Sequence, residues 1–310
     1  MKKRNFLFKI ESNTPSHFTF RIFGIKFNFL KPGIKQERKK YYKYYQSFQS
    51  ASEIPQAKGD LRLVQKANAG FLSLFDEICA KSGLKYWMDF GTLLGAIRHG
   101  GFIPWDDDID VAMPRADYEK LMSLYINGFS EYPDLELFFE NNGKNKCFLK
   151  LRHKKSKNLF IDIFPYDYYY KQLDEDGKNE LSERITLVGK ALKAKRFDSL
   201  EKVRSNMQEV TKTQLLCDNC INDNTSILPL FMALDFPHKW RNKVFDNNLI
   251  FPLIKVKFED YEFLAPNNVD KVLSSIYGDY MSIPRDSYPR HSSFLDISDD
   301  ERLLLKELAK

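Results

Sequence analysis

A cluster of four aspartates lies in the segment DDDIDVAM, residues 106–113. Carboxylates about 4 Å apart repel one another by roughly 4 kcal/mol at an effective dielectric constant of about 20. A fold keeps such a cluster because it binds a cation or because the side chains point into water. In an extended segment Ile109 and Val111 share one face, so Asp108 and Asp110 lie side by side on the other. Their hard oxygens suit Mg²⁺ or Mn²⁺, with phosphate oxygens completing the coordination shell.

The other acids near this segment fit a ligand role to different degrees. Asp106 adjoins a Pro-Trp turn and Asp107 has the wrong strand parity, so both are interpreted as loop acids. Asp162 is a lone acid in the apolar stretch FIDIF. Burial of a carboxylate between two isoleucines is costly unless it is paired or bound to a metal. We therefore expect Asp162 to join Asp108 and Asp110, the alternative being a structural acid that pairs with a base.

The elements that precede the acids predict a phosphate-binding site. Residues 86–90 are typical of a short strand, followed by Gly91, Thr92 and a short helix over 93–98. A strand, a glycine turn and a helix N-terminus expose backbone N–H groups and the positive end of the helix dipole. We predict a phosphate cradle directly upstream of the acidic strand.

These residues carry a resemblance. The string GTLLGAIRHGGFIPWDDDIDVAM is similar to the LicD family, phosphorylcholine transferases of bacterial surface glycans, and to its fukutin-related members. The Gly-Thr turn, the Asp-x-Asp strand and the later acid resemble the nucleotidyltransferase fold of polymerase-beta type. The resemblance covers roughly residues 61–293. It implies an α+β fold with a nucleotidyltransferase-like mixed sheet, flanking helices and a helical subdomain.

The resemblance also implies an activity and a set of site residues. The activity is metal-dependent transfer of a phospho-alcohol, phosphocholine from CDP-choline in the first instance, to a sugar hydroxyl of lipopolysaccharide, capsule or teichoic acid. Asp108, Asp110 and Asp162 would be catalytic residues and ligands to Mg²⁺ or Mn²⁺, with Asp162 as third ligand or as base. The implied substrate- and phosphate-binding residues are Gly91, Thr92, Arg98, His99, Lys150, Arg290 and His291.

Several alternatives stay open at this point. Arg98 and His99 could simply stabilise a helix C-terminus, and strand parity does not fix the direction of Lys150. The protein could be a nucleotidyltransferase that acts on a sugar phosphate or nucleic acid, although we expect no nucleic-acid partner. It could also be a non-catalytic scaffold, but such a scaffold has no reason to tolerate the repulsion among the acids. Cys217 and Cys220 form a CxxC pair that lacks a second pair for zinc.

The charge is distributed unevenly along the chain. The first fifty residues hold twelve Lys and Arg against two acids, so the net charge of +6 for all 310 residues leaves the remainder at −4. The stretches FTFRIF and IKFNFL alternate around Gly24 and predict a hairpin. This basic, aromatic segment could dock on an anionic membrane or only pack on the core. With no signal peptide and no run long enough to span a bilayer, we expect a cytoplasmic protein, peripheral on the membrane if the segment docks.

We predict three regions: residues 1–50 as the N-terminal segment, 51–170 as the catalytic core and 171–310 as a mainly helical region that completes the substrate site. Apolar periodicity and turn residues predict the remaining elements. The expected helices cover 61–82, a segment from Pro114, 172–243, 268–277 and 299–310. Three expected strands cover 135–140, 147–152 and 159–164, and with the two strands described above they make a mixed sheet of about five strands. Residues 255–264 also alternate like a strand.

Overall fold

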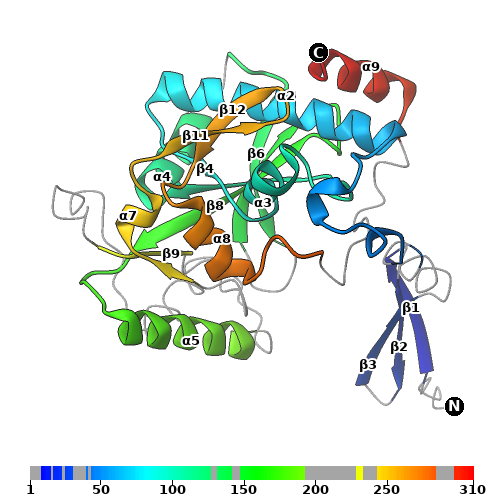
Figure 1. Cartoon of the computed structure of the whole chain (residues 1–310). Helices are drawn as coiled ribbons and strands as arrows, with labels where there is room; N and C mark the ends of the chain where they lie inside the picture. The colour runs from blue at the N-terminus through cyan, green and yellow to red at the C-terminus, as the bar shows by residue number, and fades with distance from the viewer. Residues whose placement is uncertain are drawn as a thin grey trace, which may run out of the picture.

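The computed structural model describes residues 8–14, 17–22, 25–30, 40, 43–126, 131–141, 147–192, 228–232, 243–283 and 297–310. Within this part of the chain a mixed sheet is flanked by helices, which confirms the expected α+β class (Figure 1). The predicted substrate residues Arg290 and His291 and the CxxC pair Cys217 and Cys220 lie outside the described residues, as does Gly24.

The described residues form a seven-stranded central sheet. Its strands are β4 (Trp87–Met88), β5 (Ile109–Pro114), β6 (Leu135–Asn141), β7 (Cys147–His153), β8 (Phe160–Tyr168), β9 (Leu230–Met232) and β10 (Val244–Phe245). Strand β8 lies at the centre: it is parallel to β5 on one side, and on the other it is antiparallel to β7 and then to β9. The five expected strands therefore all belong to one sheet.

Alternation along β5 and β8 creates two unlike faces. Ile109 and Val111 of β5, with Ile161 and Ile163 of β8, are fully buried on one face. Helix α4 (Arg115–Ile126) contacts both strands, and Pro114 directly precedes its first residue. Because successive side chains alternate, the residues between these apolar positions lie on the opposite face. That face carries the acids.

Further helices lie around this sheet in the described part of the chain. They are η1 (Ala51–Glu53), α2 (Gly59–Ser82), α3 (Phe90–His99), α5 (Glu175–Leu192), α7 (Asn247–Ile250), α8 (Val269–Tyr277) and α9 (Asp299–Leu308). Helix α2 ends at Gly83, whose left-handed φ of +62° favours glycine. The C-terminal helix α9 lies alongside α2, and a hairpin of β11 (Ile254–Phe258) and β12 (Tyr261–Ala265) contacts α2 and α3 (Figure 1).

Two sequence predictions need correction. Helix α3 begins at Phe90 instead of residue 93, and the strand before it shrinks to Trp87–Met88, because Asp89 caps the helix. In the region predicted as helical from 172 to 243, α5 is confirmed but Leu230–Met232 is a strand that pairs with β8. Most of the rest of that region lies outside the described residues.

The N-terminal segment forms a separate three-stranded antiparallel sheet of β1 (Phe8–Thr14), β2 (His17–Ile22) and β3 (Ile25–Leu30). The expected hairpin corresponds to β2 and β3. Strand β1 was not predicted, because its sequence FKIESNT ends in turn-forming residues. None of the helices described is long and apolar enough to cross a bilayer.

Candidate active site

Asp108, Asp110 and Asp162, termed the acid row, meet at the adjacent strands β5 and β8. Asp110 of β5 and Asp162 of β8 are direct partners in the parallel ladder, and Lys150 of β7 is the antiparallel partner of Asp162. Paired residues of neighbouring strands project to the same face of a sheet. The fold therefore brings together three side chains that lie far apart in the chain.

Asp108 joins Asp110 and Asp162 in a carboxylate cluster. Each of the three residues offers an oxygen, and these oxygens lie within 4.8 Å of one another. Opposite ligands of a Mg²⁺ ion stand about 4.2 Å apart, twice a bond length of about 2.1 Å. A small inward movement of the carboxylates would thus satisfy a divalent ion, so the donor set and its spacing fit Mg²⁺ or Mn²⁺.

The structure shows where the Lys150 side chain points. Its ammonium nitrogen lies 2.6 Å from Asp162 Oδ1, and both side chains are largely buried. The same nitrogen stands 3.7 Å from the centre of the Phe160 ring, a cation–π contact. Lys150 therefore points at the acids and offsets part of their negative charge.

The N-terminus of α3 lies against the acid row. Gly91 N–H points to Asp110 Oδ2 at 3.4 Å, and Thr92 Oγ1 accepts the backbone N–H of Asp110 at 2.8 Å. A side chain at position 91 would place its Cβ 2.8 Å from Asp106 Oδ2 and 3.6 Å from Asp110 Oδ2. Glycine thus allows carboxylates to approach the positive end of the helix dipole.

Asp89 supports this corner of the site and was not singled out in the sequence. Its Oδ1 accepts the Phe90 N–H at 2.9 Å, and its Oδ2 accepts the Tyr166 hydroxyl at 2.8 Å. The Asp89 N–H donates to Asp110 O at 3.0 Å, which ties the helix start to β5. An Asp directly before a Gly-Thr helix start is an N-cap signal that could have identified it.

Arg98 and His99 lie near the opposite end of α3, about 10 Å along the helix axis from Gly91. Arg98 is buried, and its Nη1 donates to Tyr280 O at 2.9 Å and Ser282 O at 3.4 Å. Burial lowers the pKa of Arg98 to about 10. Its Nε donates to His99 Nε2 at 3.0 Å. Burial, followed by the charge of Arg98, lowers the pKa of His99 to about 3, so His99 is neutral.

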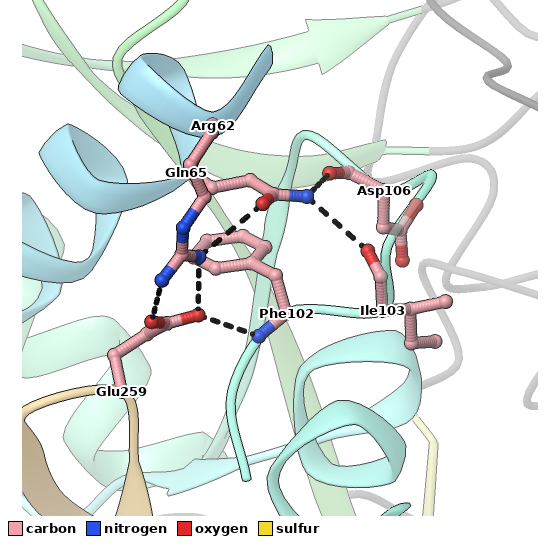
Figure 2. Close-up of polar contacts among 6 residues, drawn as sticks. All are labelled: Arg62, Gln65, Phe102, Ile103, Asp106 and Glu259. Carbon is pink, nitrogen blue, oxygen red and sulfur yellow. Dashed lines mark hydrogen bonds and ion pairs between the residues drawn. The ribbon is translucent and has the colours of Figure 1, made fainter. Parts of the chain in front are cut away.

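The loop from Gly100 to Asp108, termed the acid loop, joins α3 to the acidic strand. Asp107 is buried, and Asp106, Asp107 and Asp108 also bring carboxylate oxygens within 4.8 Å of one another. Gln65 of α2 donates to Ile103 O at 3.2 Å and to Asp106 O at 2.8 Å (Figure 2). The sequence predicted a helix over 61–82 but gave it no role at the site.

Together these features define a class of site. A three-carboxylate cluster on adjacent strands, an ammonium beside it and a helix N-terminus facing it suit a divalent cation that carries phosphate groups.

Comparison with known proteins shows what the chain is similar to. Residues 83–194 match the family described as LicD/FKTN/FKRP, nucleotidyltransferase domain. The chain is 27% identical over 261 residues to the lipopolysaccharide cholinephosphotransferase LicD of Haemophilus influenzae, covering 74% of this chain and 96% of that protein. It is 31% identical over 85 residues to human ribitol 5-phosphate transferase FKRP, covering 27% of this chain and 17% of that protein.

Proposed function

We propose that this protein is a metal-dependent phosphotransferase that moves a phospho-alcohol from a CDP-alcohol donor to a sugar hydroxyl of a surface glycan. Its similarity to two named transferases, one of cholinephosphate and one of ribitol 5-phosphate, supports transferase activity. The observation that carries the proposal is the pairing of Asp110 with Asp162 beside Asp108. In this proposal residues 51–170, which contribute strands β4 to β8 of the sheet, form a nucleotidyltransferase-like core.

Asp108, Asp110 and Asp162 would hold Mg²⁺ or Mn²⁺ through carboxylate oxygens. The ion supplies charge stabilisation on the donor diphosphate and orients it. Gly91 N–H and the dipole of α3 face the same space, so they would hold a phosphate oxygen that displaces the present contact with Asp110. Thr92 fixes that geometry through its bond to the Asp110 N–H.

Asp162 and Lys150 would have different roles in the transfer. Asp162 would accept the proton from the acceptor hydroxyl, or act as third metal ligand. Lys150 stands at Asp162 Oδ1 and would offset charge on the phosphoryl group as it transfers. Arg98 instead binds carbonyls at Tyr280 and Ser282, and so links α3 to the chain that leads toward Arg290 and His291. We assign those two residues, and His99, to the substrate site on the family pattern, within a region 171–310 that completes it.

A donor screen tests this function. The purified protein is incubated with a panel of CDP-alcohols, beginning with CDP-choline, with and without extracted surface glycan. We expect Mg²⁺- or Mn²⁺-dependent release of CMP that requires both donor and glycan. Release of pyrophosphate from a nucleoside triphosphate would instead indicate a nucleotidyltransferase, and no turnover with any donor would favour a scaffold.

We further propose that the basic N-terminal segment brings the protein to an anionic membrane, where a glycolipid acceptor would lie. The excess of twelve Lys and Arg over two acids in residues 1–50 supports this. Binding to vesicles with anionic lipid should fall with salt, and should weaken when Lys35, Lys39, Lys40 and Lys43 are all changed to Gln. Equal vesicle binding by parent and variant would remove the membrane role and leave the catalytic proposal intact.

A further inference from the structure

The acid loop is held by side chains from two distant parts of the chain. Arg62 of α2 and Glu259, at the turn between β11 and β12, form a two-bonded ion pair: Nη1 to Oε1 at 2.8 Å and Nη2 to Oε2 at 2.5 Å. Glu259 Oε1 also accepts the N–H of Phe102 at 3.0 Å, and its own N–H donates to Gly100 O at 2.9 Å. One residue therefore binds the acid loop through both its backbone and its side chain, and Figure 2 shows the side-chain contact.

The same helix holds the loop at two further points. Arg62 Nη1 lies 3.4 Å from Gln65 Oε1, so the ion pair orients the Gln65 amide. That amide donates to Ile103 O and Asp106 O, as described above. One turn later, Asn68 Nδ2 donates to Asp107 O at 3.1 Å and to Asn158 O at 2.9 Å. Residues 62, 65 and 68 recur at intervals of three, so they lie along one side of α2.

These contacts act on the backbone that carries the ligands. Asp106 and Asp107 are held by their own carbonyls, and Asp108 is the next residue. Glu259 is buried and so close to Gly101 that any side chain at 101 would collide with its carboxylate. Burial opposes the ionised form, but the bonds from Arg62 and Phe102 outweigh it and lower the pKa of Glu259. A buried carboxylate whose two oxygens both accept hydrogen bonds restricts the movement of the groups that donate to it.

We infer that Glu259, together with Arg62 and Gln65, is a positioning residue for the metal–donor site. It sets the path of the acid loop and so places the Asp108 carboxylate against those of Asp110 and Asp162. This inference rests on the proposed function, because it assumes that the three carboxylates bind a divalent ion. Loss of groups that orient metal ligands typically weakens metal binding by about 10- to 100-fold.

The test measures Mn²⁺ affinity from the paramagnetic resonance of free Mn²⁺, with the full chain and no donor present. Three variants disturb the contacts differently: Glu259→Gln removes the charge, Gln65→Met removes both amide bonds, and Gly101→Ala displaces the carboxylate. The matched control is Asp60→Asn. Asp60 lies on the same helix α2, and the change breaks its ion pair with Arg302 of α9 without touching the acid loop. Melting temperatures are recorded for all proteins.

We expect the Kd for Mn²⁺ to rise by about tenfold or more in Glu259→Gln and in Gln65→Met, and to stay within about twofold in Asp60→Asn. In turnover assays the two positioning variants should raise the metal requirement and lower kcat at saturating donor. Should one of them fail to fold, the other and Gly101→Ala decide. Unchanged Mn²⁺ affinity in the folded variants, with only a lower melting temperature, would overturn the inference.

The same experiment separates this inference from the proposed function. If the parent binds Mn²⁺ and Asp110→Asn does not, the metal site stands and the variants at 259 and 65 test the positioning role alone. If the parent binds no Mn²⁺, or if Asp110→Asn binds it as tightly as the parent, the metal site itself is wrong and the positioning role falls with it.

Discussion

Strand β8 carries two aspartates, Asp162 and Asp167, in surroundings of opposite character. Asp167 is 1% exposed, and Arg115 binds it through two hydrogen bonds of 2.7 and 3.0 Å. Asp162 instead stands beside the carboxylates of Asp108 and Asp110, with Lys150 at its Oδ1. The two aspartates differ by an odd number of residues, so they project to opposite faces of the sheet.

The difference separates an acid that supports the fold from acids that are arranged to suit a cation. Asp167 has a dedicated arginine on the apolar side, where an unpaired charge would be costly. On the other face Lys150 offsets one of three clustered charges. An excess of negative charge on a partly buried surface favours a bound cation. Substitutions on the two faces should therefore have opposite consequences for stability and activity.

The largest expected effect is on activity, at the acid row. Asp110→Asn should lower turnover by about 10³-fold or more, because charge stabilisation worth several kcal/mol is lost. The fold should survive, because the change also removes repulsion from Asp108 and Asp162. Turnover with the donor found in the screen measures the first effect, and circular dichroism checks the second. Near-parental turnover in saturating Mg²⁺ would show that Asp110 is not a ligand.

The second expected effect is on stability, on the opposite face. Asp167→Asn should lower the free energy of unfolding by about 3–5 kcal/mol, because it leaves the buried Arg115 charge uncompensated. Denaturant unfolding measures this change. Turnover per folded molecule should stay within a few-fold of the parent. Asp162→Asn is the paired control: it should cost much less stability than Asp167→Asn and far more activity.

The third expected effect is stabilisation by metal. At a free Mg²⁺ or Mn²⁺ concentration 100 times the Kd, the folded state should gain about 2.7 kcal/mol by mass action. Differential scanning calorimetry should show a rise in melting temperature for the parent and for Asp167→Asn. Asp110→Asn should show none. An equal rise in all three proteins would place the ion elsewhere.

The smallest expected effect is the pH dependence that His99 confers. Because its pKa falls to about 3 when folded, the unfolded chain binds more protons at His99 between pH 3 and about 6.5. The free energy of unfolding should therefore decrease as pH falls from 6.5 to 5, by up to about 1.4 kcal/mol per unit. His99→Gln keeps an acceptor for Arg98 Nε but does not titrate, so its pH profile should be flatter. Parallel profiles would contradict a buried, neutral His99.

Sequence patterns could predict the acid row because its determinants are local. Strand parity placed Asp108 and Asp110 on one face, and the apolar neighbours of Asp162 marked a costly acid in a strand. The direction of the Lys150 side chain depends on the register between β7 and β8. Alternation within one strand does not reveal that register. The start of α3 was missed because Phe90 begins the helix at a positive φ of 41°, an unusual conformation for a bulky residue.

The contacts around the acid loop were beyond sequence reasoning. Arg62 and Glu259 are separated by 197 positions, and each alone reads as an ordinary surface charge. Nothing in the local pattern of Gln65 or Asn68 distinguishes a buried amide that holds a loop from one that faces water. Strand β9 is only three residues long, and its pairing with β8 depends on tertiary contact.

The comparison between the two faces of β8 depends most directly on where a divalent ion binds. Mn²⁺ titrations of the parent, Asp110→Asn and Asp167→Asn, each compared per folded molecule, measure this. We predict saturable binding in the parent, the same affinity in Asp167→Asn and loss of binding in Asp110→Asn. Undiminished binding in Asp110→Asn, or loss in Asp167→Asn alone, would contradict the assignment of the acid row as the metal site.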